Sequence, residues 1–348
     1  MRLADCDQPL QQRFGTLLFD LDGVVYRGKQ PVRHAVSAIE AARAHGDGVF
    51  FVTNNSARLP RDVADQLTGL GVAAEPDDVI TSAQASADLL ATWVSAGQLQ
   101  PAARVLVVGA AGLRHAVAQA GFTPVESADQ HPDVVVQGYN PDICWHDLAE
   151  AAYAIGAGAR WLASNLDAAL PTERGSAPGN GALVQAVAMA TGATPDVAGK
   201  PERPLFDSAL HATGADRADT LMIGDRLDSD IAGANTADLA SLLVLTGVSG
   251  LADLFAAPAA HRPSYVAFDL DGLDQPQPPV RVRGDYVGCE DWTVELTDTP
   301  ALKGHGSPIA ALRAATAASW HYHDHASAGR WDPDGLIATL HGLGSDDR

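Results

Sequence analysis

Short apolar runs alternate along this chain with longer helix-like segments. The short runs predict buried strands, and the longer segments predict helices with one apolar face. Strands are expected at 16–19, 49–52, 79–81, 105–108, 134–136, 161–163, 196–198, 221–223 and 242–245. Helices are expected at 31–45, 60–70, 113–120, 145–155, 181–191, 205–212 and 230–237. This alternation indicates an α/β fold in which helices cover parallel sheets.

Polar side chains follow four of these predicted strands at the point where each strand ends. The segments are Phe19–Gly23 (FDLDG), Val52–Asn55 (VTNN), Gly199–Pro201 (GKP) and Gly224–Asp230 (GDRLDSD). Ligands of open α/β sheets bind beyond the carboxyl ends of the strands, so these groups are expected at one rim. Paired acids, a hydroxyl and an amine at one rim predict a site for Mg²⁺ and a phosphate.

A long stretch of chain separates the second of these segments from the third. Lys200 lies 147 positions after Thr53 (200 minus 53), which is far more than one sheet rim needs. The excess predicts a second α/β domain inserted at about 84–179, since loop tips of a rigid core tolerate insertions. An insertion that starts and ends beside the site is well placed to cover it.

The first segment has the chemistry for attack on a phosphate ester. Asp20 can attack phosphorus as a nucleophile once a divalent cation offsets the repulsion between carboxylate and phosphate. Asp22 can protonate the leaving group and later take a proton from water, if Gly23 lets the backbone turn sharply. Turn chemistry alone also explains an Asp-x-Asp-Gly sequence, so the isolated segment leaves both interpretations open.

A second copy of the same five residues shows how weak the isolated motif is. Phe268–Gly272 repeats Phe19–Gly23 letter for letter, and it also follows an apolar run. No Lys-Pro or Gly-Asp segment follows it at matching spacing, and only 76 residues remain (348 minus 272). We therefore predict that the second copy is the last core strand with its exit turn, and that it is catalytically idle.

The second and third segments offer groups that bind phosphate. Thr53 supplies a hydroxyl, and the neighbouring amides of Asn54 and Asn55 can donate to phosphate oxygens. The same residues would also cap the helix that follows, which is the structural alternative. Lys200 can neutralise the transferring phosphoryl group, whereas in isolation it reads as a surface lysine.

The fourth segment offers oxygen ligands for a metal ion. Asp225 follows a predicted strand and suits a hard cation. Asp228 and Asp230 can orient the waters around that cation. An acidic helix N-terminus is the structural alternative for all three.

Composition and charge narrow the function classes. The net charge of -20 over 348 residues argues against long-range attraction to nucleic acid or anionic membrane, although a local positive site can still bind a small phosphate. No apolar run approaches the roughly 20 residues of a membrane span. The polar start argues against a signal peptide, and three scattered cysteines are typical of reduced cytosolic proteins. We expect a cytoplasmic protein whose partner is a small-molecule phosphate monoester, with no nucleic-acid or membrane partner.

Together the segments resemble the motifs of the haloacid dehalogenase-like hydrolase superfamily. Within it, they are most similar to the subfamily of p-nitrophenyl phosphatases, phosphoglycolate and glycerol-phosphate phosphatases and NagD-like enzymes. The resemblance implies a Rossmann-like, doubly wound parallel-sheet core at 14–83 and 180–272 and an inserted α/β cap of class IIA at 84–179. A small C-terminal α+β appendage is expected at 273–348, outside the resemblance.

The resemblance also implies a role for each candidate residue. Asp20 would be the nucleophile and a Mg²⁺ ligand, and Asp22 would be the acid–base and contribute its backbone carbonyl to the metal. Asp225 would bind Mg²⁺ directly. The remaining positions are the phosphate-binding residues Thr53, Asn54, Asn55 and Lys200, and the residues behind the metal, Asp228 and Asp230.

Cap loops select the leaving group in capped members of this superfamily. The candidates here are Asn165, Asp167 and Glu173. Few aromatic and several polar groups favour a small hydroxylated substrate, and we expect glycerol 3-phosphate or phosphoglycolate, hydrolysed through an aspartyl-phosphate. A phosphotransferase that uses the same intermediate and a non-catalytic phosphometabolite sensor stay as alternatives.

The C-terminal segment lies outside the resemblance, after a proline-rich linker. Strands are expected at 280–287 and 292–296, and helices at 308–322 and 333–340. The order is faintly similar to part of an acetyltransferase module, but the glycine-rich loop of such modules is missing from the sequence. A packing or dimerisation role is expected for this segment, so a homodimer is among the expectations.

Overall fold

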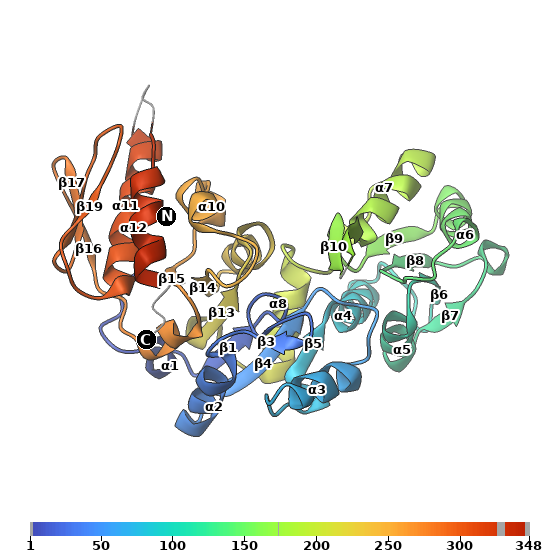
Figure 1. The fold of residues 1–348 in the computed structure, drawn as a ribbon. Coiled ribbons are helices and arrows are strands. Elements are labelled where there is room, and N and C mark those ends of the chain that lie inside the picture. Colours follow the sequence, from blue (N-terminus) through green and yellow to red (C-terminus); the bar gives the residue numbers. More distant parts are fainter. Residues whose placement is uncertain (1–2, 173, 326–330, 345–348) are drawn as a thin grey trace. The chain divides into compact units, whose positions relative to one another are not determined.

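The computed structural model describes residues 3–172, 174–325 and 331–344, and the chain divides into two compact units (Figure 1). Unit 1 takes the chain up to Phe50 and from Ala215 onward, and unit 2 takes Phe51–Gly214. The predicted domain boundaries at 84, 179 and 273 stay predictions.

Unit 1 is built on a parallel sheet with strand order β15-β14-β13-β1. The strands are β1 (Thr16–Phe19), β13 (Thr220–Gly224), β14 (Ala240–Val244) and β15 (Tyr265–Ala267). All residues of β1 and β13 are buried, which explains why both read as continuous apolar runs. β4 (Gly48–Thr53) begins here, where the Gly48 amide donates to the Gly15 carbonyl at 2.9 Å.

Short helices and a small hairpin complete this part of unit 1. The hairpin consists of β2 (Tyr26–Arg27) and β3 (Gln30–Pro31). The helices are α1 (Leu10–Arg13), α2 (Ala35–His45), α9 (Ala232–Thr236) and α10 (Leu251–Phe255). The helix predicted at 230–237 is a π-helical turn, Leu227–Ile231, followed by α9.

The C-terminal part of unit 1 adds an antiparallel sheet and two helices (Figure 1). The elements are β16 (Val280–Arg283), β17 (Tyr286–Cys289), β18 (Trp292–Glu295), β19 (Leu302–Lys303), α11 (Pro308–His325) and α12 (Asp334–Gly344). The prediction of a single strand at 280–287 is wrong. The chain reverses at Gly284, whose φ is 58°, so that β16 and β17 form a hairpin.

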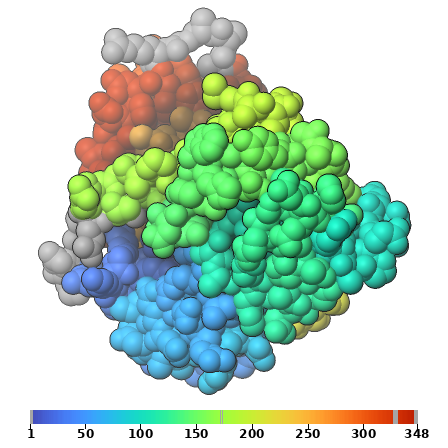
Figure 2. Space-filling view, turned by 90° about the vertical axis from the view of Figure 1, so that its right-hand side faces the viewer, coloured from blue at the N-terminus to red at the C-terminus, as the bar shows by residue number. Residues whose placement is uncertain are grey.

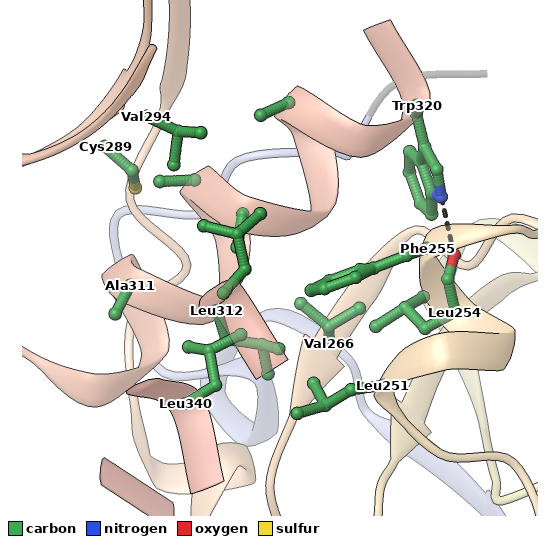
Figure 3. Close-up of a cluster of buried hydrophobic side chains, with 14 of the residues drawn as sticks. Leu251, Leu254, Phe255, Val266, Cys289, Val294, Ala311, Leu312, Trp320 and Leu340 are labelled. Carbon is green, nitrogen blue, oxygen red and sulfur yellow. Dashed lines mark hydrogen bonds between the residues drawn. The ribbon is translucent and has the colours of Figure 1, made fainter. Parts of the chain in front are cut away.

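One apolar core joins this C-terminal part to the parallel sheet (Figure 3). Leu312 of α11 lies with Phe255 of α10 and Val266 of β15, while Val294 of β18 lies on the other side of α11. The indole of Trp320 donates to the Leu254 carbonyl at 2.8 Å. Burying large side chains of this kind stabilises a fold by about 1.5–3 kcal/mol each, so the segment is an integral part of the unit.

Two buried arginines fix the same part of unit 1 by polar contacts. Arg313 is fully buried and donates to the carbonyls of Pro278 and Ala4 at 2.8 and 2.6 Å. Arg262 makes a two-pronged ion pair with Asp324, with N···O distances of 2.6 and 2.7 Å. Pairing of this kind satisfies the donors that burial takes from water.

Unit 2 contains the end of β4, a neighbouring parallel strand and three helices. They are β5 (Val79–Thr81), α3 (Pro60–Gly69), α4 (Ser82–Ser95) and α8 (Arg203–Thr213). The sequence pattern missed α4, whose N-cap is Thr81, with Gln84 closing a capping box.

A second parallel sheet in unit 2 has strand order β12-β9-β8-β6-β7. Its strands are β6 (Arg104–Val108), β7 (Thr123–Val125), β8 (Val134–Gln137), β9 (Arg160–Ala163) and β12 (Asp196–Val197). Its helices are α5 (Ala111–Gln119), α6 (Trp145–Gly156) and α7 (Asn180–Thr191), preceded by the hairpin β10 (Ala169–Thr172) and β11 (Gly175–Pro178). Helices α5 and α6, teal and green, contribute to the surface in Figure 2.

This second sheet has an apolar core of its own. Val135 and Trp161 from its strands pack with Ala151 of α6 and Val184 of α7. The short strand β12, which the sequence placed with the other motif strands, instead pairs with β9 at the edge of this sheet. Asp196 is exposed there, so β12 is not the buried strand that the sequence predicted. Among the helices that the structure describes, none is long and apolar enough to cross a membrane.

Candidate active site

Three carboxylates meet beyond the carboxyl ends of two neighbouring strands in unit 1. Asp20 follows β1, and Asp225 and Asp230 follow β13. One oxygen from each carboxylate lies within 4.8 Å of the others. Asp225 and Asp230 are only 0% and 1% exposed. Such a group carries strong mutual repulsion unless protons, donors or a cation offset it.

The backbone around Asp20 allows its carboxylate to lie close to those of Asp225 and Asp230. The Asp20 amide donates to the Ile223 carbonyl at 2.9 Å, which continues the β1–β13 ladder into the loop. Gly23 then turns the chain with a φ of 91°, a conformation that favours glycine. A Cβ at Gly23 would lie 2.6 Å from a carboxylate oxygen of Asp225, so this glycine also provides space for the acid. Asp22 is exposed beside this turn.

A loop that sequence reasoning missed holds the buried carboxylate of Asp225. The amide of Val248 donates to the Asp225 carboxylate at 2.6 Å. A Cβ at Gly247 would lie 1.8 Å from the same carboxylate, so only glycine fits there. The hydroxyl of Thr246 donates to the Gly23 carbonyl at 2.7 Å and ties this loop to the turn. The glycine just after the β14 strand was the only sequence signal.

The two acids expected behind the metal differ in their surroundings. Asp230 is buried and accepts a hydrogen bond from the Arg226 amide at 3.1 Å. Asp228 makes a two-pronged pair with the Arg226 side chain at 3.0 and 2.9 Å, and its side chain is 62% exposed. Hydrogen bonding from Arg226 holds the pKa of Asp228 below the ordinary value. The structure thus brings Asp230 into the carboxylate group and leaves Asp228 outside it.

The carboxylate group has the donor chemistry that a magnesium ion needs. Mg²⁺ takes oxygen ligands and is usually held by one or two carboxylates with water and substrate oxygens. Asp20 and Asp225 supply two such carboxylates, and Asp230 lies close enough to orient bound water. The residues present therefore fit a Mg²⁺ site.

The phosphate-binding candidates lie in unit 2, at the carboxyl end of β4. The Asn55 amide donates to the Thr53 hydroxyl oxygen at 3.1 Å. The Asn55 side-chain oxygen accepts from the amides of Ala57 and Arg58 at 2.9 and 3.3 Å. Asn55 therefore shapes the turn, and the Thr53 hydroxyl keeps its proton to donate elsewhere.

Asn54 connects the end of β4 to Lys200, which is 146 positions later. Its side-chain oxygen accepts from the Lys200 amide at 2.8 Å, and its side-chain nitrogen donates to the Lys200 carbonyl at 3.0 Å. The Lys200 ammonium donates to the Val52 carbonyl at 3.2 Å, and Lys200 is only 3% exposed. This paired contact brings Lys200 to β4 although the strand before it belongs to the other sheet.

The cap candidates reach the same place. Asn165 is buried and donates to the Asn54 carbonyl at 2.8 Å, and its side-chain oxygen accepts from the Asp167 amide at 3.2 Å. The Asp167 carboxylate accepts from the Asn54 side chain at 3.2 Å. Ser82, which sequence reasoning missed, donates to the same Asn54 carbonyl at 2.6 Å. Glu173 lies outside the described residues.

Two family models match the chain and cover more than half of it. One is described as haloacid dehalogenase-like hydrolase and matches residues 17–123. The other is described as HAD-hydrolase-like and matches residues 197–273.

Curated relatives are similar over most of the chain. A D-glycerol 3-phosphate phosphatase of Mycobacterium tuberculosis is 44% identical over 319 residues, which are 89% of this chain and 87% of that protein. An acid sugar phosphatase of Staphylococcus aureus is 35% identical over 243 residues, which are 70% of this chain and 91% of that protein.

Solved structures give the same result. A glycerol phosphate phosphatase from Mycobacterium tuberculosis, in complex with magnesium, has a TM-score of 0.78 at 41% identity and covers 90% of this chain and 92% of its own. A mutant of a thermostable p-nitrophenylphosphatase from Bacillus stearothermophilus has a TM-score of 0.65 at 34% identity. The match covers 74% of this chain and 97% of that protein. These similarities confirm the resemblance drawn from the sequence, and with it the fold class and the enzyme class. Magnesium, the expected cofactor, is present in one relative.

Proposed function

The chain belongs to the haloacid dehalogenase-like hydrolase family, and we propose that it is a Mg²⁺-dependent phosphatase whose substrate is glycerol 3-phosphate or a similarly small ester such as phosphoglycolate. The observation that carries the proposal is the close group of Asp20, Asp225 and Asp230 beyond two buried strands. The choice of substrate is supported by the 44% identity to a D-glycerol 3-phosphate phosphatase.

The proposed reaction uses Asp20 as the nucleophile. A carboxylate oxygen of Asp20 attacks phosphorus, the bond from phosphorus to the ester oxygen breaks, and Asp22 gives its proton to the departing alcohol. Water then attacks phosphorus of the aspartyl-phosphate and loses a proton to Asp22, which releases phosphate and restores both acids. When bound, Mg²⁺ offsets the repulsion between the carboxylates and the phosphate dianion.

The phosphate would be held by groups at the end of β4. We assign the Thr53 hydroxyl as a donor, because its oxygen already accepts from Asn55 while its proton stays available. The Lys200 ammonium would neutralise charge on the phosphoryl group. The side chain of Asn54 is engaged with Lys200 and Asp167, so we assign it a positioning role and leave phosphate contact to its backbone amide.

Contacts from the cap loop would determine which leaving group the enzyme accepts. Asn165 is buried in contact with Asn54 and is assigned a structural role. Asp167 is partly exposed and is the cap residue that we expect to accept a hydrogen bond from a substrate hydroxyl. A small polyol phosphate satisfies such an acceptor, so this contact favours glycerol 3-phosphate over phosphoglycolate, which ends in a carboxylate, and over an aryl ester.

A phosphate-release assay over a panel of esters tests this function. We expect turnover of glycerol 3-phosphate and phosphoglycolate to exceed that of hexose phosphates and nucleotides, and to stop when the metal is chelated and return with Mg²⁺. Adding a large excess of acceptor alcohol separates a phosphatase from a phosphotransferase, since only the latter transfers most of the phosphate to the alcohol. Binding without turnover of any ester would contradict the proposal and favour a sensor.

A further inference from the structure

A pocket lies in the C-terminal part of unit 1, and none of the residues assigned above lines it. Its volume is about 430 Å³, which is within the usual range for small-molecule sites. Most of its lining residues belong to the sheet formed by β16, β17 and β18 or to the turns between these strands. The lining residues are Pro278, Pro279, Arg281, Arg283, Tyr286, Gly288, Glu290, Asp291 and Thr293.

The pocket occupies the face of this sheet that does not pack on α11. Val287, Cys289 and Val294 are buried against the helix side. Successive residues of a strand point to opposite faces, so Tyr286 and Thr293 lie on the outer face, where both are exposed.

Two arginines stand side by side on this outer face. Arg281 and Arg283 are exposed and two positions apart on β16, so their side chains leave the same face about 7 Å apart. Within the described residues, neither guanidinium makes a hydrogen bond or an ion pair. These two cations gather positive charge on β16, while the acids that line the pocket, Glu290 and Asp291, lie in the turn between β17 and β18. The planar fork of a guanidinium matches phosphate oxygens, so a pair of them suits a phosphate or diphosphate group.

The remaining lining residues limit what else the ligand contains. Arg283 is paired across the strands with Tyr286, whose ring is half exposed, and Arg281 is paired with Gly288, which has no side chain. The pocket therefore has an open floor beside an aromatic ring, which suits a flat group. Glu290 and Asp291 line it as well and supply acceptors for hydroxyl or amino groups.

From this arrangement we propose that the pocket binds a nucleoside phosphate. Arg281 and Arg283 hold the phosphate groups, the base stacks on Tyr286 above Gly288, and the acids accept from the sugar hydroxyls or a base amino group. The proposal assigns the C-terminal part a binding role that is separate from the phosphatase site and does not depend on it.

Calorimetric titration of the full chain with ADP tests the proposal. We expect saturable binding that weakens at least tenfold in the double variant R281Q/R283Q. Gly288→Val should weaken ADP binding as much as R281Q/R283Q does, since the added side chain fills the space over Gly288 in the pocket without changing its charge. At Gly288 a Cβ would meet only the Trp292 carbonyl oxygen at 3.4 Å and Thr293 at 3.7 Å, so the strand can accommodate it. The control R61Q/R104Q removes the same charge from exposed arginines in unit 2 and should bind as wild type.

Further binding measurements distinguish a nucleotide site in this pocket from the alternative interpretations. Asp20→Asn should leave ADP affinity unchanged, and a clear change in either direction would place the nucleotide in the phosphatase site and overturn the proposal. Inorganic phosphate should bind at least tenfold more weakly than ADP, and equal affinity would show a plain anion site. Wild-type-like ADP binding by R281Q/R283Q would also overturn it. Undetectable binding of millimolar ADP by the wild-type protein would overturn it as well. If R281Q/R283Q also changed the oligomeric state, the face would be an interface between chains.

Discussion

The same five residues, Phe-Asp-Leu-Asp-Gly, occur twice in this chain and acquire different surroundings. The copy at Phe19–Gly23 follows β1, which pairs with β13, and brings Asp20 to two buried acids from the end of β13. The copy at Phe268–Gly272 follows β15, which pairs with β14 alone among the described strands, so no neighbouring strand on its other side supplies partners.

The backbones of the two copies also differ. Gly23 turns the chain with a φ of 91°, whereas Gly272 lies in a 3₁₀ turn over Leu270–Asp274. The Asp269 side chain accepts from the amide of Asp271, and Asp271 lies 2.8 Å from a ring nitrogen of His34. The comparison teaches that a local motif acquires chemistry only from the tertiary partners that its strand position supplies.

The largest difference between the copies is expected in turnover. Asp20→Asn should lower kcat by several orders of magnitude, because an amide is not a nucleophile and is a poor Mg²⁺ ligand. Asp269→Asn should retain near-normal kcat. Steady-state phosphate release by the two purified variants checks this, with circular dichroism to show that both are folded. Comparable losses from the two substitutions would remove the distinction.

The two glycines should separate activity from stability. Gly23→Ala forces a strained conformation and pushes on Asp225, and a misplacement of about 1 Å can cost about 100-fold in kcat. Gly272→Ala would put a Cβ 2.3 Å from that of Ala267, so it should lower the free energy of unfolding by about 1–3 kcal/mol without changing kcat of the folded enzyme. Kinetics and urea unfolding of both variants test the pair. A normal kcat in Gly23→Ala would contradict the role given to this turn.

A smaller effect should distinguish the two acids that follow Asp225. Asp230→Asn should weaken the apparent Mg²⁺ affinity by about 10–100-fold, because a residue that orients metal ligands is lost from a buried position. Asp228→Asn should change it by less than about threefold, since that carboxylate is exposed and paired with Arg226. Mg²⁺ titration of phosphate release measures both. The pKa of Asp228 is lowered from its ordinary value of 3.8 by Arg226, so this carboxylate stays charged at neutral pH in both the free and the Mg²⁺-bound enzyme.

The smallest effect concerns stability and the second copy of the motif, Phe268–Gly272. Burial raises the pKa of Asp269 above its ordinary value of 3.8. Ionised Asp269 therefore costs stability above the unfolded-state pKa, and protonation relieves this cost as the pH falls. At pH 7, Asp269→Asn should leave the free energy of unfolding unchanged or raise it by at most about 1 kcal/mol, because the side chain is partly exposed. The difference in the free energy of unfolding between the variant and the wild type should become smaller toward pH 4. Urea unfolding at both pH values tests the sign, and a clear destabilisation at pH 7 would show that the charge is used.

Much of the fold and site could be predicted because it depends on local pattern. Buried strands such as β1 and β13 read as continuous apolar runs, and polar residues at their carboxyl ends mark the rim. The second sheet was expected because the distance from Thr53 to Lys200 demanded it. The edge strand β12 was misplaced, since two residues, one of them exposed, carry no information on which sheet they join.

The rest depends on contacts between residues far apart in sequence. Nothing near Asn54 indicates that its side chain pairs with the backbone of Lys200. Nothing near Thr246 indicates that its hydroxyl holds the Gly23 carbonyl, 223 positions away. The sequence predicted a packing or dimerisation role for the C-terminal segment but not its contacts, in which Trp320 and Leu312 complete the core beside β15. Such pairings are set by packing and not by periodicity.

The most direct test of the account is to find the residue that carries phosphate during turnover. p-Nitrophenyl phosphate, whose leaving group departs without a proton from Asp22, would be mixed with the Asp22→Asn enzyme and Mg²⁺ and quenched in acid within milliseconds to seconds. The peptides would then be analysed by mass spectrometry. Phosphate is expected on the peptide that contains Asp20, and it should be absent when the metal is chelated and in a variant that also carries Asp20→Asn. Phosphate on the peptide that contains Asp269, or steady turnover with no phosphorylated peptide at any time point, would contradict it.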